Sequence, residues 1–323
     1  MIRPFQLRDW GLVQQLSQHS VPLNASLILL YPSSPVRAAI SHRLLQRNYP
    51  TYVWRSDKAP SVQGYVQLRV DKGHSQANVL WVGSILSKRP VEGWTHQRVW
   101  QGLFDELAVY LGQNGIQNVV AEARENSVES DILRDIGFAN YTRQDLYKLE
   151  LGVSLSAEMT LLQNRQTVDD WNIEKLYAHS VPNMIRLIEP HPPYGEDSWV
   201  CYEDDELVTY AHVTTGRDAK WLRLYGNMNA KTDASDMIGE IVKEQSTSAT
   251  IHTLFSSVRP YQSWLAAPLE KNGFQYLDSQ LVMVRHTVQP IRASRSSLEK
   301  LLATNGATAR TTPIVHKQES KSF

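Results

Sequence analysis

The feature that most constrains this chain is a pattern that occurs once in each half of the sequence. The tetrapeptide His-Ser-Val-Pro stands at 19–22 and again at 179–182, after similar amphipathic stretches. The dipeptide Gly-Phe stands at 137–138 and at 273–274, and an alternating apolar run follows it both times. Self-similarity over such distances indicates one fold used twice. We therefore expect two tandem domains, the second shortened in its middle.

The repeat predicts the domain boundaries. The first copy is expected over 1–150 and the second over 165–292, with a linker at 151–164 between them. Residues 293–323 are rich in Ser, Thr, Ala and Lys and contain few aromatic side chains. A segment of this composition buries too little apolar surface to order itself, so a flexible tail is expected there.

Hydrophobic periodicity predicts a mixed α/β fold, with a mixed sheet flanked by helices in each copy. In the first copy, an amphipathic helix around Leu12 and Leu16 comes first. The later elements are a helix at 34–44, strands at 52–55, 64–70 and 79–86, a helix at 95–111, a strand at 116–123, a helix at 127–136, and paired strand segments around Tyr141 and Leu146. The second copy repeats this order from its first hairpin onward.

Charge and cysteine content exclude several classes of function. The chain has 33 basic and 33 acidic side chains, so its formal charge is zero and neither nucleic acid nor a membrane is expected as a partner. Cys201 is the one cysteine, which excludes an intramolecular disulfide and a cysteine-based metal site, and no histidine pair has metal-ligand spacing. The N-terminus lacks the apolar core of a secretory signal. A soluble, cytoplasmic protein without a metal is expected.

The order of elements, the stretch Val-Val-Ala-Glu-Ala at 119–123, Asn126, Leu133 and the Gly-Phe at 137–138 together resemble the GNAT superfamily of N-acetyltransferases. The resemblance covers 1–150 and, more faintly, 165–290. It implies a mixed sheet that splays between its fourth and fifth strands, with acetyl-CoA as co-substrate in the opening. Its pyrophosphate would lie at the N-terminus of the next helix, where free backbone N–H groups and the helix dipole attract anions.

The resemblance also implies which residues contact the cofactor. The family's phosphate loop corresponds to 89–95, in which Gly93 fits the pattern, Arg89 stands one position early and Thr95 replaces a small residue. The Thr95 hydroxyl could cap the helix or contact a phosphate, and a plain turn that needs Gly93 is the alternative to a phosphate site. The candidate cofactor-binding residues are Ser84, Ile85, Arg89, Gly93, Trp94, Thr95 and Asn126.

The second copy has a different loop at the corresponding place. Residues 227–236 contain no glycine, and Asp233 and Asp236 stand at the helix start. A carboxylate at that position accepts hydrogen bonds from the backbone donors that a phosphate would use. We therefore expect that this copy binds no CoA and supports the first.

Glu122 is the candidate general base, because it lies on the strand where the resemblance places such a group. The family's acidic tyrosine is replaced by Leu133 in the first copy and by Leu269 in the second. The segments 189–195 and 259–261 are further candidates for a substrate groove between the copies.

The sequence thus predicts an N-acyltransferase that moves an acetyl group from acetyl-CoA to a small-molecule or peptide amine. Two alternatives stay open. One is a non-catalytic acyl-CoA-binding or sensing module, and the other is an aminoacyl or peptidyl transferase of the tandem type. The sequence identifies neither the acceptor nor the oligomeric state.

Overall fold

Both halves of the sequence contribute strands to one mixed sheet. The computed structural model describes residues 1–32, 34–45, 48–70, 75–86, 93–152, 160–189, 191–192, 194–195, 197–247 and 251–287. The predicted tail at 293–323 and part of the predicted linker lie outside these residues. Contacts group Met1–Val288 into one compact unit, so the two copies are not separate bodies.

The first half contains the helices and strands that the periodicity predicts, together with short elements that it does not. Thr95 caps the helix at 96–113, because its side chain accepts a hydrogen bond from the N–H of Arg98. Ser127 caps the helix at 128–135 in the same way, through the N–H of Ser130. The elements are β1 (Ile2–Pro4), a 3-10 turn (Leu7–Asp9), α1 (Trp10–Ser17), β2 (Val21–Pro22), α2 (Ala25–Leu30), α3 (Pro35–Leu45), β3 (Thr51–Arg55), β4 (Val62–Val70), β5 (Gln76–Leu86), α4 (His96–Gln113), β6 (Asn118–Arg124), α5 (Val128–Asp135) and β7 (Ala139–Glu150).

Within the described residues, the second half repeats this order with one strand and one α-helix fewer before its first hairpin. Its elements are β8 (Gln163–Asn164), a 3-10 turn (Thr167–Asp169), α6 (Asp170–Ser180), α7 (Asn183–Arg186), β9 (Ser198–Glu203), β10 (Glu206–Thr215), β11 (Lys220–Gly226), α8 (Ala234–Thr247), β12 (Thr253–Val258), η3 (Pro260–Leu265), α9 (Ala266–Lys271) and β13 (Gln275–His286). The repeat in the sequence is therefore a repeat in the structure.

The paired strand segments expected around Tyr141 and Leu146 form one strand instead. The 12 residues of β7 run without a turn, because the residues between these two positions include neither glycine nor proline. Register shifts in its pairing with β13 mark the irregular points of this long strand.

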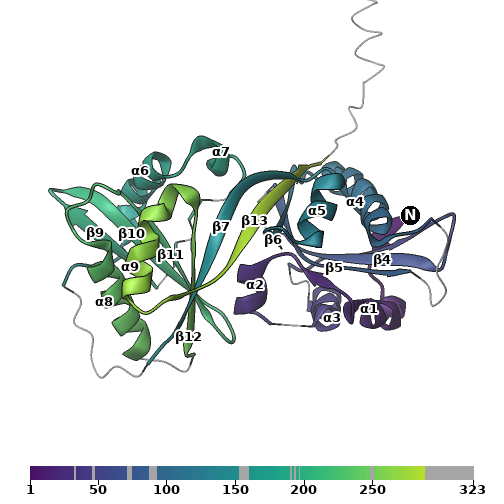
Figure 1. Ribbon diagram of the computed structural model, residues 1–323, viewed down its shortest axis with the longest axis horizontal. Coiled ribbons are helices and arrows are strands. Elements are labelled where there is room, and N and C mark those ends of the chain that lie inside the picture. Colours follow the sequence, from purple (N-terminus) through teal and green to yellow (C-terminus); the bar gives the residue numbers. More distant parts are fainter. Residues whose placement is uncertain are drawn as a thin grey trace, which may run out of the picture. The chain divides into compact units, whose positions relative to one another are not determined.

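The halves exchange their final strands. The order in the sheet is β1-β3-β4-β5-β6-β13-β7-β12-β11-β10-β9-β8 (Figure 1). Strand β13 ends the second half, yet it pairs antiparallel with β6 and β7 of the first half. Strand β7 in turn pairs with β13 and β12 of the second half. Met283 on β13 is fully buried in the core of the first half, so this core is complete only when both halves are present.

Each half contains one parallel strand pair that is joined at its start and then diverges. Strands β5 and β6 pair only over Gln76–Asn78 with Asn118–Val120, and β11 and β12 only over Lys220–Leu222 with Leu254–Ser256. In the first half, α4 and α5 cover one face of the sheet and α1, α2 and α3 the other (Figure 1). The divergence opens the sheet at the carboxyl ends of these strands, where ligands of α/β proteins commonly bind.

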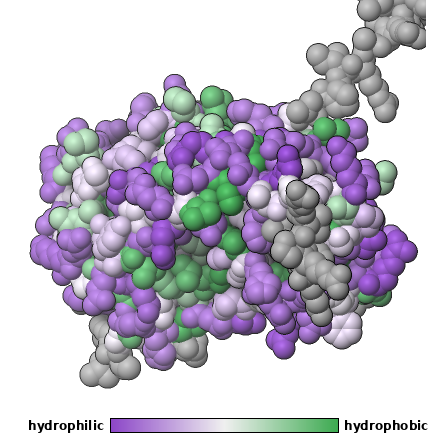
Figure 2. Space-filling view, turned by 45° about the vertical axis from the view of Figure 1, so that its right-hand side comes forward, coloured by the Kyte–Doolittle hydropathy of each residue, from purple (hydrophilic) through white to green (hydrophobic). Residues whose placement is uncertain are grey.

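Hydrophilic side chains cover most of the face seen in Figure 2, and hydrophobic side chains gather near its middle. No helix within the described ranges is long and apolar enough to span a membrane.

Candidate functional site

Glu122 lies on β6 beside the point where β5 and β6 diverge. Its side chain is 9% exposed, and its carboxylate accepts a hydrogen bond of 2.8 Å from the N–H of Ala25 at the start of α2. Leu23, just before α2, bridges the two strands: its N–H donates to the carbonyl of Leu80 at 2.9 Å and its carbonyl accepts from the N–H of Glu122 at 2.7 Å. The chain between α1 and α2 therefore fixes the carboxylate at the base of the opening.

Burial has a direct effect on the charge of Glu122. Loss of hydration raises the pKa of its carboxyl above the ordinary value, and the positive charge of Arg259, the N–H of Ala25 and the charge of Arg223 oppose this only in part. A carboxylate with a raised pKa can take up a proton nearer to neutral pH, as a general base must.

A cavity of about 400 Å³ lies in front of Glu122 and is shared by the two halves. Strand alternation places Val120 and Glu122 on this side of β6, while Ala121 and Ala123 belong to the core under α4. The polar lining residues include Asn24, Asn78, Glu122, Tyr141, Glu189, His191, Arg223, Tyr225, Arg259 and Tyr261. The diverging strand pairs of both halves thus contribute to one cavity.

A partly buried ion pair lies in the wall of this cavity. A terminal nitrogen of Arg259, Nη2, lies 2.5 Å from Oε1 of Glu189, and the same oxygen accepts a hydrogen bond of 2.9 Å from the hydroxyl of Tyr141. The segments 189–195 and 259–261, predicted as parts of a groove between the copies, therefore supply Glu189, His191, Arg259 and Tyr261 to the cavity. Tyr141 joins them from the exchanged strand β7.

Solved structures with a similar fold are found. A GCN5-related N-acetyltransferase from Sphaerobacter thermophilus is 10% identical with a TM-score of 0.50, over 90% of this chain and 96% of that one. The chain adopts the GNAT fold. A tandem GNAT protein from the clavulanic acid biosynthesis pathway is 13% identical with a TM-score of 0.47, over 90% of this chain and 99% of that one. An acetyltransferase of the GNAT family from Colwellia psychrerythraea is 12% identical with a TM-score of 0.42, over 89% of this chain and all of that one.

Sequence comparisons add no closer relative. No protein-family model matches the chain, and no curated protein does. The identities of 10 to 13% bear on the GNAT fold alone.

The resemblance predicts a CoA pyrophosphate at the N-terminus of α4. Gly93 adopts a left-handed backbone with φ of 76°, which glycine tolerates without strain. The hydroxyl of Thr95 accepts from the N–H of Arg98, so this side chain caps the helix, one of its two predicted roles. Arg89 lies outside the described residues. What is described of this end fits an anion.

The other predicted cofactor residues lie around that helix end. The hydroxyl of Ser84, on β5, lies 2.7 Å from Nδ1 of His96, the first residue of α4. Ile85 follows on the same strand opposite Gln63. Trp94 packs on the core of the first half, with its ring 6.2 Å from that of Trp54.

Asn126 is exposed in the turn after β6, with a positive φ of 58°. It leads into α5, and within the described residues it forms no hydrogen bond with Ser84 or His96. The turn conformation explains why asparagine suits this position, because its side chain tolerates the left-handed region.

The second half does not fit a CoA pyrophosphate. The carboxylate of Glu203, at the end of β9, accepts from the N–H of Lys231 at 2.9 Å and from that of Thr232 at 2.7 Å. Asp233 accepts from the N–H of Ser235 in the same way. The backbone donors before α8 are therefore already occupied by carboxylates of the chain.

The family's tyrosine acid has no counterpart in either half. Leu133 on α5 and Leu269 on α9 are both fully buried, each in the core of its own half. These positions hold the helices against the sheet and offer no proton to a leaving group.

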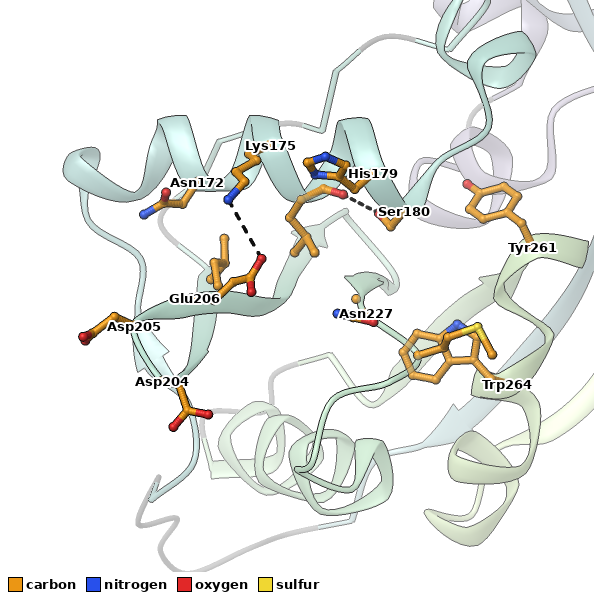
Figure 3. Close-up of a pocket in the computed structure, with 14 residues that line it drawn as sticks. Asn172, Lys175, His179, Ser180, Asp204, Asp205, Glu206, Asn227, Tyr261 and Trp264 are labelled. Atoms are coloured by element: carbon orange, nitrogen blue, oxygen red, sulfur yellow. Dashed lines mark hydrogen bonds and ion pairs between the residues drawn. The ribbon is translucent and has the colours of Figure 1, made fainter.

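A second cavity, of about 540 Å³, lies within the second half. Figure 3 shows Asn172, Lys175 and His179 along α6, facing the turn that carries Asp204 and Asp205. Lys175 lies 3.9 Å from a carboxylate oxygen of Glu206. All of the described residues that line it come from the second half, and Tyr261 lines both this cavity and the one at Glu122.

Arg223 and Tyr141 are among the polar groups at the shared cavity that the sequence does not indicate. Arg223 stands in the predicted strand 221–225, and Tyr141 also lies in a predicted strand segment. A charged residue in the middle of an apolar strand was the available signal for Arg223. The role of Arg223 depends on its strand facing the other half of the molecule, and the sequence does not show that arrangement.

Proposed function

We propose that this protein is an N-acyltransferase that transfers an acetyl group from acetyl-CoA to an amine held in the shared cavity. The observation that carries the proposal is the buried carboxylate of Glu122 at the opening between β5 and β6, with a raised pKa and direct access to a cavity. Acetyl-CoA, when bound, supplies an activated acyl thioester.

The first half is the one that would hold the donor. Gly93 and the capped N-terminus of α4 offer an anion site, and Ser84 and Ile85 continue from it along β5. In the second half, Glu203 and Asp233 occupy the corresponding backbone donors. The proposal therefore includes one donor site per chain.

Glu122 would take the proton that the acceptor loses. An amine is protonated and unreactive at neutral pH, so a group of the protein must accept its proton before attack. The ionised carboxylate is available for this above its raised pKa, and the N–H of Ala25 holds it in place. Arg223 and Arg259 help to keep it ionised.

A second candidate function is a binding module with the same fold and no turnover. The complete burial of Leu133, where the family has its tyrosine acid, favours it, because no proton donor replaces the tyrosine there. The two candidates share the cavity and differ in chemistry.

Thiol release from acetyl-CoA, measured with the twenty amino acids and simple polyamines as acceptors, separates them. Transfer is supported if release stops in Glu122→Gln and persists in Glu125→Gln, whose carboxylate lies just beyond β6 and pairs with Arg143. Binding of acetyl-CoA without any thiol release would contradict transfer and leave the binding module.

A further inference from the structure

Two residues that line the shared cavity have buried hydrogen-bond donors without a partner among the described residues. The Nη1 atom of Arg259 and the Nε1 atom of Trp221 are both buried, and neither has a hydrogen-bond partner among the described residues. Both residues line the cavity, and Trp221 is 2% exposed. A guanidinium and an indole N–H can only donate, so a partner for them must be an acceptor.

Arg223 adds a positive charge to these donors. It stands on β11 between Trp221 and Tyr225, and its side chain is exposed. Within the described part of the chain, its guanidinium has no salt bridge or hydrogen bond, although its charge acts on Glu122. An arginine left free in this way beside two unpaired donors is suited to a carboxylate.

The acidic groups of the cavity are not equivalent. Glu189 is neutralised by Arg259 and accepts from Tyr141. Among the described residues, the carboxylate of Glu122 forms no salt bridge, and it accepts a hydrogen bond from the backbone N–H of Ala25. An ammonium group of a ligand would supply the missing counter-charge.

We infer that the acceptor is an amino acid, bound through both of its charged groups. The carboxylate is held by Arg223, the Nη1 of Arg259 and the Nε1 of Trp221, and the amine lies at Glu122. The inference rests on the proposed function for the role of Glu122, but the recognition of the carboxylate does not require transfer. A cavity of about 400 Å³ lies at the small end of the roughly 300–1,000 Å³ of ligand pockets, which suits a single amino acid.

The test is binding of the twenty free amino acids to the full chain without acetyl-CoA, by calorimetry, each followed by its carboxamide. At least one amino acid should bind, and its carboxamide should bind at least tenfold more weakly because it lacks the negative charge. Arg223→Gln should lower the affinity for that amino acid about tenfold and bring the ratio between acid and amide close to one. Arg55→Gln, which changes an exposed arginine of β3 outside the cavity, should leave both unchanged.

Two results would overturn the inference: no binding by any amino acid, or equal binding of the acid and its amide. Failure of the proposed function looks different. If an amino acid binds with the expected dependence on Arg223 but acetyl-CoA neither binds nor releases thiol, the amino-acid site stands and the transferase proposal is wrong. If acetyl-CoA is used and the amide serves as acceptor as well as the acid does, the transferase proposal stands and the amino-acid site is wrong.

Discussion

The carboxylate of Glu122 and the backbone N–H of Ala25 are joined by a hydrogen bond of 2.8 Å that connects β6 to the first turn of α2. This bond fixes a buried acidic group where the sheet opens. Because the N–H of Ala25 belongs to the main chain, the position of the carboxylate depends on the path of the chain between α1 and α2. The site is thus built by a loop as well as by the strand.

Replacement of the carboxylate is expected to remove turnover. Glu122→Gln keeps the shape and the hydrogen bond from Ala25 but cannot accept a proton, so kcat should fall by about 10²- to 10⁴-fold while acetyl-CoA still binds. In the wild type, kcat/KM should rise with pH through the raised pKa of Glu122, above the ordinary glutamate value of about 4.3. Thiol release between pH 4 and pH 9 measures both; an unchanged rate in the variant would contradict the assignment.

The same group predicts a pH-dependent difference in stability. A carboxyl whose pKa is raised by folding stabilises the native state below its unfolded pKa, and this contribution is lost as pH rises through the folded pKa. Glu122→Gln does not titrate. The variant should therefore gain thermal stability relative to the wild type as pH rises, with the difference smallest near pH 4. Thermal unfolding at pH 4 and pH 8 checks this, and a constant difference would argue against a buried ionised Glu122.

The sequence predicts part of this site and cannot predict the rest. Glu122 is found because the resemblance places a base on its strand, and the loop at Gly93 because glycine and a helix start are visible in the residues. Arg223 and Tyr141 reach the cavity only because two halves face each other across it. Nothing local in their strands indicates which face will meet a partner.

The exchange of final strands makes a prediction about stability. Met283, on β13 of the second half, is fully buried in the core of the first half, so Met283→Ala should lower the free energy of unfolding by about 2–5 kcal/mol. Leu277→Ala, on the same strand but 49% exposed, should cost less than about 1 kcal/mol. Chemical denaturation measures both values. Similar small losses in the two variants would show that β13 does not complete that core.

This exchange also explains a limit of the sequence analysis. The runs 146–149 and 281–284 are both apolar and follow the same Gly-Phe motif, so each would suit either half. Alternation along a strand shows which side chains share a face but not which neighbour the strand pairs with. The repeat is therefore readable from the residues, whereas the partner of each final strand is not.

The loop before α8 in the second half leads to a prediction about stability. The side chain of Thr232 and the N–H groups of Lys231 and Thr232 hydrogen-bond to the carboxylate of Glu203, and these bonds lower its pKa. Glu203→Ala should destabilise the protein by about 1 kcal/mol at neutral pH. Folding lowers the pKa of the Glu203 carboxyl. Its contribution to stability is therefore present above the pKa of the unfolded state and is lost as pH falls through the pKa of the folded state. Thermal unfolding of this variant and of Glu206→Ala, an exposed control, tests the contrast; equal effects would contradict the role given to Glu203.

The most direct test of the account is a calorimetric titration of the full chain with acetyl-CoA. We predict one binding site per chain, because within the described ranges carboxylates accept from backbone N–H groups before α8, whereas no carboxylate does so before α4. Gly93→Glu should weaken binding at least tenfold, since it adds a negative charge and strains a left-handed position. Met228→Glu, which adds the same charge to an exposed loop residue of the second half, should leave it unchanged. No binding at millimolar acetyl-CoA, two sites per chain, or equal binding by Gly93→Glu would contradict the account.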